Sequence, residues 1–277
     1  MCIKNSVISS KLFTVVFTTL AMPSQADSNL EFGLGGLVIS FPHYPGSQEQ
    51  NTLAVPLPYF SYQDDNLVLN RNGLIGTIFH YENWYLDLSL SGGIPVDSDD
   101  SEIRYGMPDL DWTFEVGPQL HYYSLGKHGD SSFLRNSVYL RSVTATDLSY
   151  LDSVGWRAGI GVELVTDFPL DGSYSLTWTN SVTVNWADSE YLNYFYSVPD
   201  LYATETRDSF YSQSGYSSAE FTSSLTFSYE KTRLSCFLRY RNYAGTAAFD
   251  SPIMQRNSDF IFSISLVQIL GGVSWNN

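Results

Sequence analysis

The four histidines, His43, His80, His121 and His128, are the side chains best suited to catalysis. A serine hydrolase needs a histidine within hydrogen-bond reach of its serine nucleophile. The most suggestive pair is His121 and Ser124, but residues three apart in an extended strand point to opposite faces. No two histidines have the close spacing of a metal-binding pair, and no cysteine accompanies them. We therefore interpret all four as isolated polar or interfacial side chains, and we expect no catalytic residues, no enzymatic activity and no cofactor.

A run of acidic residues is the second candidate for chemistry, because carboxylates at high density can bind Ca²⁺ or Mg²⁺. Against a calcium site, the run lacks the central Gly and terminal Glu of a 12-residue calcium loop. A solvated loop is the favoured interpretation, and a divalent-cation site is the alternative. The residues concerned are Asp97, Asp99, Asp100 and Glu102, followed by Asp109 and Asp111.

Composition excludes several classes of protein. The 277 residues include 14 Lys and Arg against 29 Asp and Glu, a formal net charge of -15. Binding to nucleic acid requires a basic surface, so we expect no nucleic-acid partner. The 6 Trp, 20 Tyr and 17 Phe exclude a disordered acidic tail, because they can bury far more surface than such tails contain.

The N-terminus has the pattern of a secretory signal peptide. Lys4 and Lys11 precede an apolar stretch from Leu12 to Met22, and Ser24-Gln25-Ala26 supplies small residues for cleavage after Ala26. The apolar stretch is about half the roughly 20 residues that a transmembrane helix needs. We predict a signal peptide over residues 1–26 and one mature domain over residues 27–277. That domain retains a single cysteine, Cys236, so no internal disulfide is expected.

Alternation of apolar and polar residues dominates the mature chain. Over residues 174–186, one face carries Tyr174, Trp178 and Trp186, and the other carries mostly Ser and Thr. A soluble sandwich would place its apolar face inward, whereas a membrane barrel places it outward. These strands are longer than the five or six residues of typical globular strands, and aromatics stand at their ends, as in the girdles of membrane barrels. We therefore predict an all-β transmembrane antiparallel β-barrel in the outer membrane.

The spacing of turn signals predicts about 12 strands, with 10 to 14 possible. The number should be even because the N- and C-termini of the chain in a bacterial barrel both face the periplasm. Longer connections are expected at residues 42–52, 93–111, 187–215 and 244–256. The alternation of short and long connections holds only if residues 66–80 form two short strands with a turn at Asn72-Gly73. The aromatic segment 187–215 is expected to fold over the barrel mouth or to extend the strands, in preference to binding a ligand.

The polar faces predict the contents of the lumen. Unpaired charges inside a narrow barrel are costly, so we expect cross-strand ion pairs to fill much of it. A barrel of this size can be plugged or can leave a slim pore. The charged residues predicted to face the lumen are Asp87, Glu115, Arg141, Arg157, Glu163, Glu220, Arg233, Arg239 and Arg241.

Several short segments, in their order along the chain, carry a resemblance to a known family. They are Gly33 to Gly36, Tyr44 to Ser47, Pro56-Leu57-Pro58, Gly106 to Asp111, Glu115 to Pro118, Tyr194 to Val198 and Asp250 to Ile253. With these segments the chain resembles the MipA/OmpV outer-membrane proteins, also described as MltA-interacting proteins, over essentially its whole mature length. One departure is the C-terminus, where the chain continues past Trp275 instead of ending on an aromatic strand residue.

The resemblance implies a scaffold that links the outer membrane to murein-remodelling enzymes. Its implied partners are a lytic murein transglycosylase and a bifunctional penicillin-binding protein, besides the outer-membrane lipid and lipopolysaccharide around the barrel. The resemblance carries no catalytic residues. The alternative is a narrow pore for small-solute diffusion.

Overall fold

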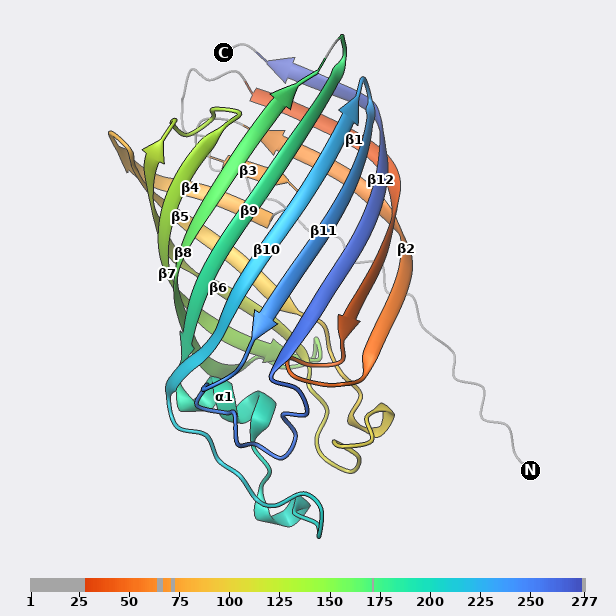
Figure 1. The fold of residues 1–277 in the computed structure, drawn as a ribbon, viewed down its shortest axis with the longest axis vertical. Coiled ribbons are helices and arrows are strands. Elements are labelled where there is room, and N and C mark those ends of the chain that lie inside the picture. Colours follow the sequence, from red (N-terminus) through yellow and green to blue (C-terminus); the bar gives the residue numbers. More distant parts are fainter. Residues whose placement is uncertain (1–27, 64–66, 71–72, 171, 276–277) are drawn as a thin grey trace, which may run out of the picture.

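A computed structural model describes residues 28–63, 67–70, 73–170 and 172–275. The predicted signal peptide lies outside these described residues. The described chain forms twelve antiparallel strands, which confirms the predicted fold class and strand number. Each strand pairs with its neighbours in sequence, and β1 pairs with β12 to complete the barrel (Figure 1). The strands are β1 Ser28–Pro42, β2 Gln50–Gln63, β3 Leu67–Asn70, β4 Gly73–Tyr81, β5 Trp84–Gly93, β6 Trp112–Leu125, β7 Phe133–Thr146, β8 Asp152–Pro169, β9 Tyr174–Ala187, β10 Gly215–Tyr229, β11 Thr232–Asn242 and β12 Ser258–Trp275.

The two ends of the barrel differ, as Figure 1 shows. At the turn end, β4 and β5 are joined through residues 82–83, and β10 and β11 through residues 230–231. At the loop end lie residues 43–49, 94–111, 147–151, 188–214 and 243–257, together with helix α1 Ser189–Tyr196 and the 3-10 helices η1 Ser98–Asp100 and η2 Asp200–Tyr202. The predicted division of residues 66–80 into two strands is confirmed, since β3 and β4 form a separate hairpin.

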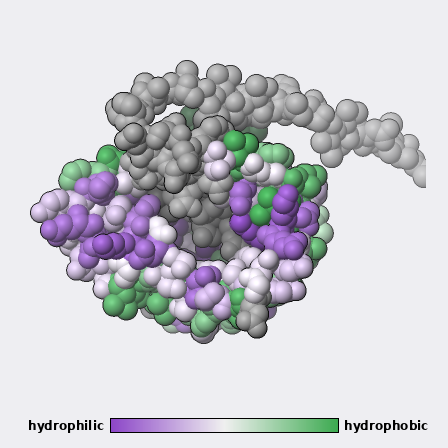
Figure 2. Space-filling view, turned by 90° about the horizontal axis from the view of Figure 1, so that it is seen from above, coloured by the Kyte–Doolittle hydropathy of each residue, from purple (hydrophilic) through white to green (hydrophobic). Residues whose placement is uncertain are grey.

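The apolar faces point outward. Alternate strand residues such as Leu34, Val138 and Ile160 are largely exposed, while their neighbours on the inner face are buried or partly buried. Aromatic residues at the ends of the strands, including Trp84, Trp112 and Trp186, are exposed as well. Exposed apolar side chains at this density suit lipid and not water. Seen from the turn end, hydrophilic residues form patches on the surface that faces the viewer, and hydrophobic residues lie around the outside of the barrel (Figure 2).

The seam between β1 and β12 depends on glycine. A β-carbon on Gly33 would lie 2.3 Å from the backbone oxygen of Gln268, and one on Gly35 would lie equally close to that of Leu266. Gly36, on the opposite face, has open space around it. The glycine-rich segment of β1 therefore allows the two terminal strands to approach each other and close the barrel.

We expect Gly33→Ala to lower the free energy of unfolding by about 1–3 kcal/mol, because the added methyl group must push back a backbone oxygen. Urea unfolding of the purified barrel in detergent micelles measures the change. Gly36→Ala is the matched control and should leave the midpoint unchanged. Equal effects of the two substitutions would contradict a steric role for Gly33.

Candidate functional site: the lumen and its cover

An ion-pair network crosses the loop-side half of the lumen. Its centre is Arg157 on β8, whose Nη1 lies 2.7 Å from Glu115 Oε1 on β6 and whose Nη2 lies 3.7 Å from Glu220 Oε1 on β10. Arg141 on β7 approaches the other oxygen of Glu115 at 3.6 Å. Arg239 on β11 has Glu220 as its closest ion-pair partner, at 3.9 Å. The network joins strands β6, β7, β8, β10 and β11, so the interior of the barrel is bridged at this level.

Two further groups complete the loop-side network. Arg241 donates from Nε and Nη2 to the carboxylate of Asp259, at 2.8 and 3.0 Å, and Tyr243 donates to the same carboxylate at 2.8 Å. The Tyr139 hydroxyl donates to Asn185 at 2.7 Å, and the Asn185 amide donates to Glu220 at 2.9 Å. Charged groups here are therefore held by hydrogen bonds as well as by opposite charges.

The turn-side half of the lumen holds smaller pairs. Arg135 contacts Glu163 at 2.8 Å, and Arg233 contacts Glu31 at 2.7 Å and donates to the Tyr59 hydroxyl. Asp87 is 1% exposed; it accepts a hydrogen bond from Thr77 at 2.9 Å and lies 3.3 Å from His121 Nε2.

The nine charged residues predicted to face the lumen lie in these groups. Sequence analysis missed Glu31, Arg135 and Asp259. Each of these three residues supplies the opposite charge for one of the predicted residues. Alternation could have found Glu31 and Arg135, since both stand on the polar face of a strand. Asp259 stands at the second position of β12, where the alternating pattern has only begun.

The histidines are less isolated than predicted. His121 is buried beside Asp87, while His80 and His128 stack on the ring of Tyr85, with ring centroids 5.5 and 4.7 Å away. His43 lies in the loop-end segment 43–49, with its Nδ1 3.6 Å from Glu49. Asp87 stands on β5 and His121 on β6, so their contact is a tertiary one that spacing along one strand does not contain.

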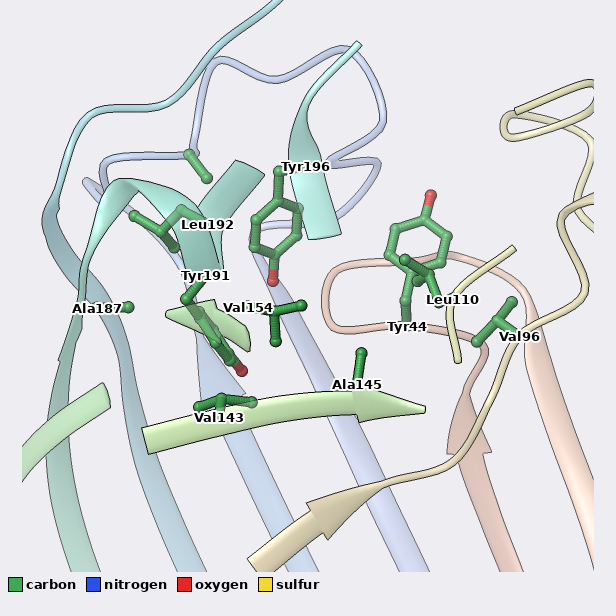
Figure 3. Close-up of a cluster of buried hydrophobic side chains, with 11 residues drawn as sticks. Tyr44, Val96, Leu110, Val143, Ala145, Val154, Ala187, Tyr191, Leu192 and Tyr196 are labelled. Atoms are coloured by element: carbon green, nitrogen blue, oxygen red, sulfur yellow. The ribbon is translucent and has the colours of Figure 1, made fainter. Parts of the chain in front are cut away.

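A cover of loop residues closes the loop end over this network. Helix α1 supplies Tyr191, Leu192 and Tyr196, which pack with Tyr44 and Leu110 from two other loops. Figure 3 shows Tyr191 directed from the helix toward Val143 on β7. The aromatic segment 187–215 therefore folds over the barrel mouth, one of the two arrangements predicted for it.

The first turn of α1 is fixed by its N-cap. Asp188 Oδ1 accepts from the Tyr191 backbone N–H at 2.9 Å, and Oδ2 accepts from the Trp156 N–H at 3.0 Å. Gly155, at an irregularity in the β7–β8 pair, leaves room for this cap. Below the helix, the Arg157 guanidinium lies 5.2 Å from the centre of the Tyr191 ring. The cover and the ion-pair network are thus in direct contact.

Two buried arginines hold the long loops together. Arg104, 2% exposed, donates to the backbone oxygens of Pro108 at 2.9 Å and Phe195 at 3.2 Å. Arg207 donates to the backbone oxygens of Ile103 and Tyr202, at 2.6 and 2.7 Å. Burial raises the pKa of the Tyr194 hydroxyl to about 12, so this group stays neutral and accepts a hydrogen bond from the Asp111 N–H at 2.7 Å. These contacts join residues 94–111 to the segment that forms the cover.

Two of the acidic residues considered as metal ligands accept hydrogen bonds within their own loop. Asp97 caps η1 by accepting from the Asp99 N–H at 2.9 Å, and Asp109 accepts from the Ser98 N–H at 2.8 Å. Asp99 and Asp100 lie within the first turn of η1. Within the described residues, no group of three or more His, Cys, Asp or Glu side chains has an arrangement that could hold a metal ion.

Beneath the cover lies a cavity of about 380 Å³. Arg141, Arg157, Arg239 and Arg241 line it, together with Glu115 and Glu220. Tyr191, Leu192, Phe195 and Tyr196 form its roof. The volume lies within the range of small-molecule sites. The arrangement can bind a small charged or amphipathic molecule, but a wide aqueous channel through this level would require the cover to move.

Comparisons with known proteins give one family and several distant structural likenesses, of which two are described. None of the helices in the described part of the chain is long and apolar enough to cross a membrane. OccK8 (OprE) of Pseudomonas aeruginosa is 7% identical, with 90% of this chain and 98% of that chain covered and a TM-score of 0.27. A FadL homologue of Pseudomonas aeruginosa is 11% identical, with 89% and 91% covered and a TM-score of 0.26. TM-scores this low carry no argument about function.

No curated protein matches the chain. The sequence model of one family does match, over residues 34–267, and that family is described as MltA-interacting protein MipA. The match covers most of the barrel, from β1 to β12. The resemblance predicted from short segments is therefore confirmed, and the chain belongs to the MipA family.

Proposed function

We propose that this outer-membrane β-barrel acts as a non-catalytic scaffold that holds murein-remodelling enzymes at the membrane. The family description, MltA-interacting protein, supports a lytic murein transglycosylase as one partner. A bifunctional penicillin-binding protein is the second partner of the proposal, so that wall cleavage and synthesis occur at one place. Outer-membrane lipid and lipopolysaccharide surround the exposed apolar side chains of the strands.

The observation that carries this proposal is the closed loop end. Ion pairs bridge the lumen from β6 to β11, and α1 packs over them. A barrel devoted to diffusion is expected to keep an open channel, whereas a scaffold needs only a stable wall and a surface for its partners. The interior of this barrel suits the second role better.

In this proposal the partners contact the turn end. Bacterial barrels carry short turns on the periplasmic side and longer loops outside, and murein lies in the periplasm. The turn end offers exposed charged residues in two connections, at Lys127 and Asp130 and at Glu230 and Lys231. Contacts at such a rim affect association through charge complementarity.

We expect the double variant Lys127→Glu/Lys231→Glu to weaken capture of a purified lytic murein transglycosylase several-fold, because it reverses the two positive charges at the turn end. Binding is measured by pull-down and by biolayer interferometry with the barrel in nanodiscs. The matched control is Glu205→Lys/Asp208→Lys, which reverses two exposed charges at the loop end and should bind as the parent does. Failure of the parent barrel to bind the transglycosylase would refute the proposal.

A narrow pore for small solutes is the second candidate, and the cavity beneath the cover is the observation in its favour. Single-channel recording in planar bilayers separates the two. A scaffold with the cover in place should be electrically silent, whereas a pore should give stable conductance steps in the parent protein.

A further inference from the structure

Among the described residues, strand pairing is incomplete on one side of the barrel. β2 pairs with β3 only at Tyr62 and Gln63, and β3 pairs with β4 over four residues. Only two residues join Asn70 to its partner Gly73, so the hairpin ends at this level. Among the described residues, β2 from Gln50 to Ser61 pairs with β1 alone, and β5 from Leu90 to Gly93 pairs with β6 alone. We call the space between these two segments the lateral interval.

The sequence of β2 is suited to an unpaired edge. In an antiparallel ladder, alternate residues direct their N–H groups to opposite neighbours. β2 nevertheless keeps a regular register with β1 through Pro56 and Pro58, opposite Gly36 and Leu34. Proline has no N–H, so it fits only at positions of β2 that donate no hydrogen bond to β1. The backbone groups at those positions face the lateral interval. Two of the donors that would be unsatisfied at this edge are thereby absent.

Side-chain exposure agrees with an opening. Asn51 to Pro56 are all exposed, on both faces of β2, whereas β6 alternates between exposed and buried residues along most of its length. Leu53 and Val55 share the inner face with the buried Tyr59, yet they are 43% and 40% exposed. The interior here is apolar, since the inner face of β1 carries Leu37, Ile39 and Phe41 beside them.

The cavity beneath the cover connects the lateral interval with the arginines. Its lining includes Ile39 and Phe41 near the end of β1 and Ser91 to Gly93 at the end of β5, which flank the interval on either side. The far wall carries four arginines and two glutamates. Three buried polar atoms of residues in that wall, Arg157 Nε, Ser217 Oγ and Glu115 Oε2, have no hydrogen-bond partner among the described residues, and Arg141 Nη1 lies 3.6 Å from the last of them. Among the described residues, Arg239 makes a 3.4 Å hydrogen bond to Thr222, approaches Glu220 at 3.9 Å and lies 5.4 Å from the centre of the Phe237 ring.

We propose that this cavity binds a single-chain amphipathic anion, which enters sideways from the membrane through the lateral interval. The hydrocarbon chain lies along the apolar inner faces of β1 and β2, and the anionic head reaches Arg239, whose side chain is 39% exposed. Strand edges at membrane depth are tolerated only where protein buries them or where they line a water-filled cavity, and the cavity beneath the cover lies beside this edge. Pairing of the edge with a second copy of the chain is disfavoured, because Pro56 and Pro58 remove donors from it. This inference does not depend on the scaffold role.

The test uses the full barrel in phosphatidylcholine nanodiscs, with dodecanoate and dodecyl phosphate as probes and dodecanol as the neutral control. Native mass spectrometry should show one bound anion per barrel and little bound dodecanol. Arg239→Gln should weaken binding of both anions about tenfold, whereas Lys127→Gln at the turn end should have no effect. Binding of only one of the two anions would support the site and identify its headgroup. Absence of bound anion, or equal binding of dodecanol, would overturn the proposal.

A second measurement keeps the proposal testable if Arg239→Gln fails to fold. Val55→Cys and Ala54→Cys, each in a Cys236→Ser background, place a thiol on the inner and outer face of the same strand. Dodecanoate should slow reaction of a water-soluble thiosulfonate several-fold at position 55 and leave position 54 unchanged. Equal protection at both positions would overturn the proposal. So would a disulfide-linked dimer through position 54, since it would show the edge paired with a second copy.

Discussion

Replacement of Arg157 by methionine is expected to lower the free energy of unfolding by about 3–5 kcal/mol, because it leaves buried carboxylates without their central counter-charge. Glu115 is 5% exposed and holds the shortest ion pair of the loop-side network, at 2.7 Å to Arg157. Arg141, at 3.6 Å, is too far to replace that contact. The substitution also removes the cation beneath the Tyr191 ring, so the cover loses a contact at the same time. Equilibrium unfolding in urea, followed by tryptophan fluorescence in detergent micelles, measures the loss.

The control for Arg157→Met is the triple variant that also carries Glu115→Gln and Glu220→Gln. Removing both carboxylates with the arginine leaves no uncompensated charge, so much of the stability should return. Arg135→Met is a second comparison at the other end of the lumen, where Glu163 is more exposed and a smaller effect is expected. If Arg157→Met unfolds at the parent midpoint, the network does not stabilise the barrel.

The barrel itself could be predicted because the alternating pattern that indicates it lies within each single strand. Along residues 174–186 every second side chain except Asn180 is apolar, and the structure makes this segment β9, Tyr174–Ala187. The division of residues 66–80 into two strands was also accessible, because turn chemistry and the parity of the connections both require it; Asn72 itself lies outside the described residues. The alternation of apolar and polar residues along a strand does not depend on which strand it pairs with, so these inferences needed no knowledge of tertiary contacts.

The partners inside the lumen could not be predicted in the same way. Alternation indicates that Arg157 points inward, but its contacts come from β6 and β10, each two strands away around the barrel. The short pairing of β3 with β2, at two positions only, was also hidden, since the turn signal of a hairpin does not show how far its strands pair with their other neighbours. The role of Asp188 depends on Gly155, which is 33 residues earlier in the sequence and is brought to the cap only by the β7–β8 irregularity.

Gly155→Ala is expected to displace α1 and open the barrel mouth. Gly155 has a φ of +103°, and a β-carbon there would lie 2.2 Å from Asp188 Oδ1 and 2.7 Å from the Tyr191 backbone nitrogen. The left-handed backbone alone costs a non-glycine residue about 1–3 kcal/mol. The two close contacts fall on the N-cap and first turn of the helix, so the strain is relieved most readily by moving the helix off the mouth.

Single-channel recording measures this displacement, because a barrel whose cover has moved should pass ions that the parent excludes. Gly129→Ala separates the backbone strain from the contact, since Gly129 has a φ of +90° but nothing within 4 Å of an added β-carbon. It should lose a similar amount of local backbone stability and remain electrically silent. Conductance in Gly155→Ala alone would identify α1 as the closure of the lumen. Silence in both variants would place the closure in the ion-pair network beneath α1, and the Arg157→Met variant would then be the one expected to conduct.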